Sequence, residues 1–135
     1  MRLTTRGKYA VTALLDLSLN ESGNKFISIS QIALRQDISV SYLEQLFRNL
    51  RKAGIVQAAR GPGGGYRLSR PSTEINVSEV VASVEDKMDA TQCGGESDCH
   101  SGNTCLAHDL WTELNDQVDS FLLSKSLEDV IANKR

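Results

Sequence analysis

A run of five residues, Gly61-Pro62-Gly63-Gly64-Gly65, restricts the local fold more than any other segment, because neither a helix nor a central strand tolerates it. Residues 55–60 (IVQAAR) before the run and residues 66–68 (YRL) after it have the composition of β-strands. The segment is therefore predicted to form a β-hairpin whose tip is mostly backbone, with Arg60 and Arg67 at its two sides.

A glycine-rich loop can also bind the phosphates of a nucleotide. The sequence argues against that function, because the run lacks a Gly-Lys-Ser/Thr ending and no helix follows whose N-terminus would hold a phosphate. A tip without side chains can instead approach a DNA phosphate or enter a minor groove, where the negative potential attracts Arg60. The hairpin thus has the features expected of a DNA-binding wing.

Helices are predicted before the hairpin. Apolar residues recur at helical spacing over residues 5–20, and residues 22–24 (SGN) end that helix. A short strand is predicted at residues 26–27. Residues 28–31 (SISQ) form a capping-box pattern that opens a short helix over residues 29–36.

A second short helix follows a turn at residues 37–39. Ser41 and Glu44 form another capping-box candidate, and the helix is predicted to run to Ala53 and to end at Gly54. The residues predicted for its buried face are Ile38, Leu43, Leu46, Phe47 and Leu50. Two short helices joined by a tight turn are typical of a helix-turn-helix.

The exposed face of the second helix is polar, and its members are Ser39, Ser41, Tyr42, Glu44, Gln45, Arg48 and Arg51. In a major groove, Gln45 could bind adenine, and Glu44 could accept from cytosine N4 or repel DNA where the fit is poor. Arg48, Arg51 and the neighbouring Lys52 are expected near phosphates. Alone, this pattern fits a solvated helix face equally well; with the hairpin, it favours a winged-helix DNA-binding domain. The hairpin residues expected at DNA are Arg60, Gly61, Gly63 and Gly64.

Charge is distributed unevenly along the chain, although the formal net charge is only −2. Residues 1–71 hold eleven Lys and Arg against four Asp and Glu, whereas residues 72–135 hold four against thirteen. A chance distribution of solvated charge would explain this, but the basic part is also the part with the winged-helix pattern. We therefore expect residues 1–71 to be the domain that contacts a polyanion.

The second half, residues 72–135, begins at a Pro-Ser-Thr-Glu boundary and is predicted to be helical except for one segment. A short helix is expected over residues 77–86, capped by Asn76 or Ser78, and a final one over residues 126–131. A long helix is expected from about Thr104, with an apolar stripe of Leu106, Leu110, Leu114, Val118, Phe121 and Leu122. Little protein remains to cover this stripe, so it is predicted to form a homodimer rather than to pack on its own domain. The expected fold is mainly α with a small β-hairpin wing.

The segment at about 87–105 lacks periodicity and holds all three cysteines of the chain, spaced C-x5-C-x5-C-x2-H from Cys93 through Cys99 and Cys105 to His108. No stretch approaches the roughly 18 apolar residues of a membrane span, and the N-terminus does not resemble a signal peptide. The protein is therefore expected in the cytoplasm, where clustered cysteines indicate metal or redox chemistry rather than disulfides.

Two kinds of metal centre fit these ligands. Three cysteines and one histidine are a common zinc set, but zinc sites more often have shorter Cys–Cys spacings. Wide spacing favours an iron–sulfur cluster, in which each of two irons takes two protein ligands. His108 is preferred to His100 as the fourth ligand, because in a helix Cys105 and His108 would lie on one face of the first turn.

Three segments carry a family resemblance: residues 1–11 (MRLTTRGKYAV), residues 41–47 (SYLEQLF) and residues 60–66 (RGPGGGY). Together with the C-x5-C-x5-C-x2-H set, they resemble the iron–sulfur cluster regulators of a bacterial family of winged-helix repressors, over nearly the whole chain. Relatives that sense nitric oxide also carry three cysteines, so His108 is the residue that favours the cluster-regulator branch.

This resemblance implies a homodimeric transcription factor, not an enzyme, that carries a [2Fe–2S] cluster on Cys93, Cys99, Cys105 and His108. It implies repression of cluster-assembly genes from promoter DNA, a different class of DNA site for the cluster-free form, and assembly or carrier proteins as cluster donors. The alternatives are a nitric-oxide- or redox-sensing repressor of the same family and a zinc-stabilised repressor. Glu44 is expected to distinguish the two classes of DNA site. Its carboxylate would be buried against the DNA, and burial without a hydrogen-bonding partner is costly.

Overall fold

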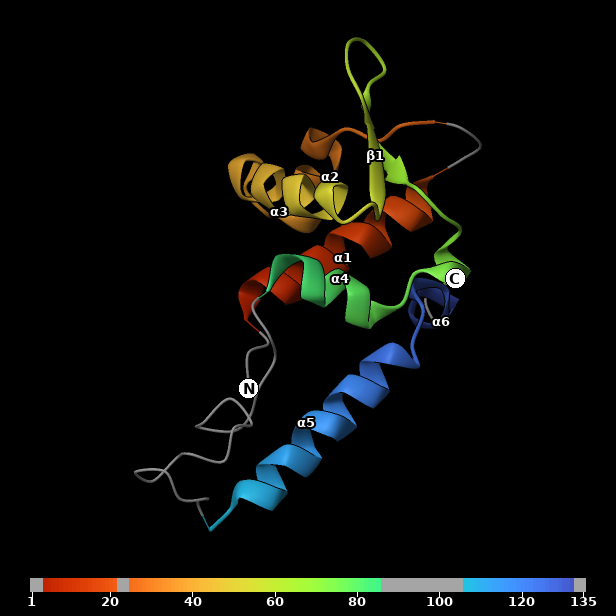
Figure 1. Cartoon of the computed structure of the whole chain (residues 1–135). Helices are drawn as coiled ribbons and strands as arrows, with labels where there is room; N and C mark the ends of the chain where they lie inside the picture. Colours follow the sequence, from red (N-terminus) through yellow and green to blue (C-terminus); the bar gives the residue numbers. More distant parts are fainter. Residues whose placement is uncertain (1–3, 22–24, 86–105, 133–135) are drawn as a thin grey trace.

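The structure is a computed structural model and describes residues 4–21, 25–85 and 106–132. In these ranges it is mainly helical, with one two-stranded antiparallel hairpin, as the sequence predicted (Figure 1). The elements are α1 (Thr5–Asn20), α2 (Ile29–Gln36), α3 (Val40–Lys52), β1 (Val56–Ala59), β2 (Gly65–Leu68), the 3-10 turn η1 (Ser72–Glu74), α4 (Val77–Val84), α5 (His108–Leu123) and α6 (Leu127–Ile131).

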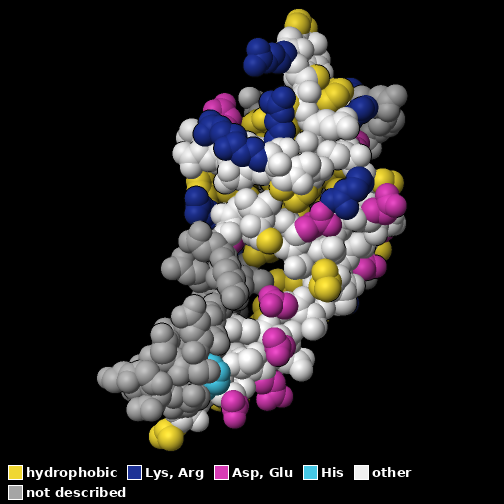
Figure 2. All heavy atoms as spheres, viewed as in Figure 1, with side chains coloured by type: hydrophobic (Ala, Val, Ile, Leu, Met, Phe, Trp, Pro, Cys, Tyr) yellow, Lys and Arg dark blue, Asp and Glu magenta, His cyan; other side chains and the backbone are white. Residues whose placement is uncertain are grey.

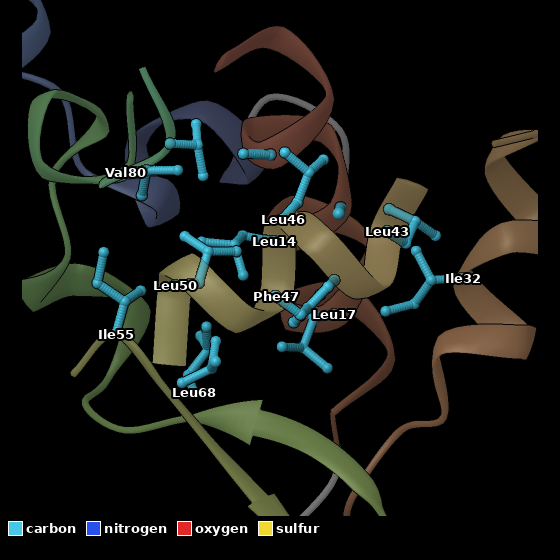
Figure 3. Close-up of a cluster of buried hydrophobic side chains, with 14 of the residues drawn as sticks. Leu14, Leu17, Ile32, Leu43, Leu46, Phe47, Leu50, Ile55, Leu68 and Val80 are labelled. Atoms are coloured by element: carbon cyan, nitrogen blue, oxygen red, sulfur yellow. The ribbon is translucent and has the colours of Figure 1, made fainter. Parts of the chain in front are cut away.

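Helix α1 lies at the centre of the packing and contacts α2, α3, α4, α6 and β2. The core around it is apolar and closely packed, with Leu14 and Leu17 of α1 facing Leu43, Phe47 and Leu50 of α3 (Figure 3). All five side chains have no exposed surface. The same core includes residues from both predicted halves, since Ile75, Val80, Val84 and Leu127 belong to it. The functional division at residue 71 stays a prediction.

The helix-turn-helix is formed by α2 and α3. The predicted capping box at the start of α2 is confirmed: the Gln31 backbone N–H donates to Ser28 Oγ, and the Ser28 backbone N–H donates to Gln31 Oε1. Asp37 ends α2 in the left-handed conformation, with φ 55° and ψ 51°, which turns the chain toward α3. The predicted cap of α3 is wrong. Ser39, not Ser41, is the N-cap residue, and its hydroxyl accepts from the Tyr42 N–H.

The hairpin pairs Val56 with Leu68 and Ala59 with Gly65, so residues 60–64 form its tip. The predicted strand at residues 26–27 is wrong, because only Ile27 pairs, in an isolated bridge to Tyr66. Two backbone hydrogen bonds of 2.8 Å each make this bridge, one in each direction. The bridge attaches the wing to the connection between α1 and α2.

Helix α4 begins at a capping box of Asn76 and Glu79, which selects Asn76 over Ser78 as the cap, and it ends at Val84 rather than residue 86. The long helix α5 begins at His108, so the predicted start near Thr104 is wrong. A third capping box, of Ser126 and Asp129, opens α6. Helix α5 extends away from the rest of the described chain (Figure 1), and none of its residues is buried.

Candidate nucleic-acid interface and metal ligands

The outer face of α3 presents the predicted DNA-binding side chains. Ser41, Glu44, Gln45, Arg48 and Arg51 are exposed, whereas the predicted buried residues of this helix face the core. The sequence therefore distinguished the two faces of α3 correctly. Contact with DNA by the outer face stays a prediction.

Two residues at the start of α3 have structural partners as well. The Ser39 hydroxyl, which accepts from the Tyr42 N–H at 3.2 Å, keeps its own hydrogen available for a phosphate. The Tyr42 ring is half-buried and meets the Tyr9 ring of α1 edge to face, with centroids 5.7 Å apart and an interplanar angle of 86°. Tyr42 thus connects the predicted interface to the first turns of α1.

Basic and acidic side chains are separated on the surface. Figure 2 shows Lys and Arg side chains over α3 and the wing, and Asp and Glu side chains along α5. The uneven charge along the sequence therefore becomes a basic face near the helix-turn-helix and an acidic face on the long helix. A polyanion such as DNA is attracted to the first and repelled by the second.

The glycines of the wing are needed for its backbone geometry. Gly61 and Gly63 have positive φ angles, of 87° and 76°. A Cβ atom on Gly64 would lie 2.4 Å from the carbonyl oxygen of Ala59. The Gly64 N–H also donates to the Gly61 carbonyl at 2.9 Å and closes the tip. These glycines were predicted to allow close approach to DNA, and the turn itself also requires them.

The two arginines beside the tip differ in their surroundings. Arg60 is exposed at the end of β1. Arg67 is half-buried, donates to Gln57 Oε1 at 3.1 Å, and lies over the Phe26 ring with 4.8 Å to its centroid. Of the two, Arg60 therefore has the accessible position that minor-groove contact requires.

A buried charged group escaped the sequence analysis. Asp16 of α1 is only 3% exposed, and Arg35 at the end of α2 donates to its carboxylate from Nη2 at 2.7 Å and from Nε at 3.0 Å. Hydrogen bonding to Asp16 raises the pKa of Arg35 above its ordinary value, more than desolvation lowers it. The apolar periodicity of α1 gives no signal for this pair, because Asp16 interrupts the stripe and Arg35 lies nineteen positions away.

A second missed contact lies at the start of α1. The backbone N–H and the hydroxyl of Thr4, which caps α1, both donate to the carboxylate of Glu85. Glu85 follows α4 and is the last described residue before the cysteine segment. The N-terminal end of α1 therefore contacts both α3 and the residue that precedes this segment.

Of the predicted metal ligands, only His108 lies within the described residues. It is the first residue of α5 and is half-buried, with Nε2 3.5 Å from Thr112 Oγ1. Cys93, Cys99, Cys105 and the competing His100 lie outside the described residues, so the ligand set stays a prediction. Because α5 begins at His108, it does not include Cys105, and the first helical turn predicted to hold both residues is wrong. Within the ranges that are described, no group of three potential ligands occurs.

Large apolar side chains are exposed on α5. Leu110, Phe121 and Leu123 are 57%, 60% and 62% exposed. Leu114, Val118 and Leu122 of the predicted stripe are half-buried. In the described parts of the chain, no helix is long and apolar enough to span a bilayer.

The chain is similar to known transcriptional regulators over nearly its whole length. The family model Rrf2, described as an iron-dependent transcriptional regulator, matches residues 3–133. The HTH-type transcriptional regulator IscR of Photorhabdus laumondii is 48% identical over 134 residues, covering 99% of this chain and 81% of that protein.

Two solved structures are similar over almost the whole chain. IscR of T. potens has a TM-score of 0.81 and 30% identity, and the match covers 100% of this chain and 89% of that one. CymR, the global cysteine regulator of B. subtilis, has a TM-score of 0.82 and 27% identity, with 98% of each chain covered.

Proposed function

Because the chain belongs to the Rrf2 family of DNA-binding transcriptional regulators and is not an enzyme, we propose that it senses an iron–sulfur cluster and represses cluster-assembly genes. The observation that carries this proposal is the combination of a basic recognition helix and wing with the C-x5-C-x5-C-x2-H ligand set. The relatives named IscR support the same branch of the family.

DNA contact is assigned to α3 and the wing. Gln45 and Glu44 face outward from α3, where side chains reach base edges in a major groove. Arg48 and Arg51 lie further along the helix and are assigned to phosphates, and Arg60 to the minor groove. Ser39, Ser41, Tyr42, Gly61, Gly63 and Gly64 complete the proposed interface.

The proposed cofactor is a [2Fe–2S] cluster, held by Cys93, Cys99, Cys105 and His108. Three thiolates and a neutral imidazole are chemically suited to it, and His108, the first residue of α5, is half-buried. When bound, the cluster supplies a reversible redox and occupancy signal. Imidazole ligation makes binding sensitive to pH, because a protonated His108 cannot act as a ligand.

A signal at the cysteine segment needs a physical connection to the recognition helix. The contact of Glu85 with Thr4 and the ring contact of Tyr9 with Tyr42 provide one through α1. Cluster binding changes DNA affinity only if it favours one arrangement of these contacts over another. We assign α1 this coupling role.

The proposed assembly is a homodimer formed through α5, since its large apolar side chains are exposed in the single chain. A twofold dimer presents two recognition helices to paired half-sites in promoter DNA. Iron–sulfur assembly or carrier proteins are the proposed donors of the cluster.

The direct test is anaerobic purification followed by visible absorption spectroscopy and metal analysis. The proposal predicts a red-brown protein whose absorption is lost in Cys93→Ala, Cys99→Ala or Cys105→Ala, with two irons per chain. A colourless protein with one zinc per chain would contradict it and favour a zinc-stabilised repressor. Nitric oxide is the alternative signal. If nitric oxide released the protein from DNA as fully as cluster removal does, while the iron content stayed unchanged, the nitric-oxide-sensing alternative would be favoured.

Site selection is tested with Glu44. Glu44→Ala should narrow the difference in affinity between the two classes of promoter site for the cluster-free protein, because the unfavourable carboxylate is removed. Glu113→Ala, which removes an exposed carboxylate outside the proposed DNA interface, is the matched control. Unchanged selectivity in Glu44→Ala would remove the role assigned to Glu44.

A further inference from the structure

We propose that Asp16 is a positioning residue for DNA binding, and that Arg35 acts on DNA affinity only by holding Asp16 rather than by contacting phosphate. Neither residue belongs to the recognition helix or to the wing. The inference depends on the family's DNA binding and does not require the proposed cluster.

Asp16 is a buried carboxylate whose hydrogen bonds come from two helices. Arg35 donates from Nη2 and Nε, and Gln36 Nε2 donates at 2.8 Å. Asn20 of α1 adds a longer contact of 3.5 Å from Nδ2. A carboxylate that is 3% exposed is costly unless it is paired and hydrogen-bonded. These donors therefore keep the end of α2 in one position relative to α1.

The position of this network in the chain gives it influence over the recognition helix. Arg35 and Gln36 are the last two residues of α2. Asp37 follows in the left-handed conformation, and Ser39 then caps α3. Only three residues thus separate the fixed end of α2 from the first residue of α3, so a shift of α2 tilts α3 with it.

Direct contact with a DNA phosphate is the competing role for Arg35, because this residue belongs to the basic half of the chain. It lines a polar concavity between α2 and the wing, together with Lys25, Gln31 and Gly64. Its side chain is 36% exposed. The geometry nevertheless favours positioning, because Nε and Nη2 both donate to Asp16, and their alignment requires the planar guanidinium.

Salt dependence separates the two roles. The logarithm of DNA affinity falls linearly with the logarithm of salt concentration, with a slope proportional to the number of phosphates neutralised. Removal of a phosphate contact lowers that slope by about one, as we expect for Arg48→Gln. Loss of a positioning residue lowers affinity at every salt concentration and leaves the slope unchanged.

The experiment measures DNA affinity by fluorescence anisotropy across a salt series for wild type, Arg35→Gln, Arg35→Lys and Arg48→Gln. Both Arg35 variants should bind about tenfold more weakly with the wild-type slope. Lysine should not rescue, because a single ammonium group cannot form the paired contacts to Asp16. A lower slope in Arg35→Gln, or restored affinity in Arg35→Lys, would overturn the proposal.

Asp16→Asn provides a second, independent measurement. The asparagine oxygen can still accept a hydrogen bond from Gln36, so the buried side chain at position 16 keeps one partner. Its ion pair with Arg35 is lost. The double variant Asp16→Asn/Arg35→Gln should bind no more weakly than the weaker single variant, because both changes remove one interaction. Fully additive losses would contradict the proposal.

Discussion

Substitution of Gly65 by alanine tests how the wing is held in place. Gly65 has a φ of 149°, and a Cβ atom would lie 2.2 Å from the carbonyl oxygen of Ile27 and 2.4 Å from its carbon. The backbone at Gly65 must therefore move away from the backbone at Ile27, and the two hydrogen bonds of 2.8 Å between Ile27 and Tyr66 are lost. Two backbone hydrogen bonds contribute about 1–3 kcal/mol together, and residual strain adds about 1 kcal/mol.

We therefore expect Gly65→Ala to lower the free energy of unfolding by about 2–4 kcal/mol and to weaken DNA binding, because the wing is no longer attached. Urea unfolding at one fixed protein concentration measures the first effect. Gly63→Ala is the matched control: its φ is 76°, but no atom lies within 4 Å of the added carbon. Its cost is about 1 kcal/mol from backbone conformation alone. Equal destabilisation by the two substitutions would refute the argument from close contact.

Three further predictions concern coupling, pH and assembly. Glu85→Gln should reduce the change in DNA affinity that accompanies cluster loss while leaving the visible absorption of the cluster intact. If the ratio of DNA affinities with and without cluster equalled that of the Glu113→Gln control, the route through Thr4 would be excluded. Hydrogen bonds from Ser126 lower the pKa of Asp129, so this cap stabilises the fold above the ordinary aspartate pKa of about 3.9 and is lost as the pH falls through the lowered pKa. Asp129→Ala removes the carboxylate that accepts from the Ser126 backbone N–H, so it should destabilise the protein to urea at pH 7 and progressively less in acid; a pH-independent effect would contradict the assignment. Phe121→Glu should convert the dimer into a monomer, because it places a charge on the exposed apolar face of α5. Light scattering measures the mass, and an unchanged mass would exclude that face as the dimer interface.

The local elements could be predicted where one short-range pattern decided the outcome. The bounds of α1 and α2, the capping box at Ser28 and the buried face of α3 follow from periodicity and from residues within one turn. The cap of α3 was misplaced because Ser39 and Ser41 are both good N-cap residues, and the choice depends on the left-handed turn at Asp37.

Long-range contacts were the part that sequence patterns could not supply. The strand predicted at residues 26–27 is a single bridge, because its pairing depends on where β2 lies. The Asp16–Arg35 and Thr4–Glu85 contacts join residues nineteen and eighty-one positions apart. The apolar stripe of α5 and its lack of cover were predicted, but Leu106 of that stripe precedes the helix, and only Leu110 and Phe121 of the members within α5 are exposed.

The most direct test of the central proposal is the DNA affinity of one anaerobic preparation before and after removal of its cluster. The proposal predicts that the cluster-loaded dimer binds the promoter of a cluster-assembly operon more tightly than the cluster-free dimer, while the cluster-free form keeps its affinity for the second class of site. Identical affinities of both forms for both classes of DNA, in a protein shown by iron analysis to have held and lost its cluster, would contradict it.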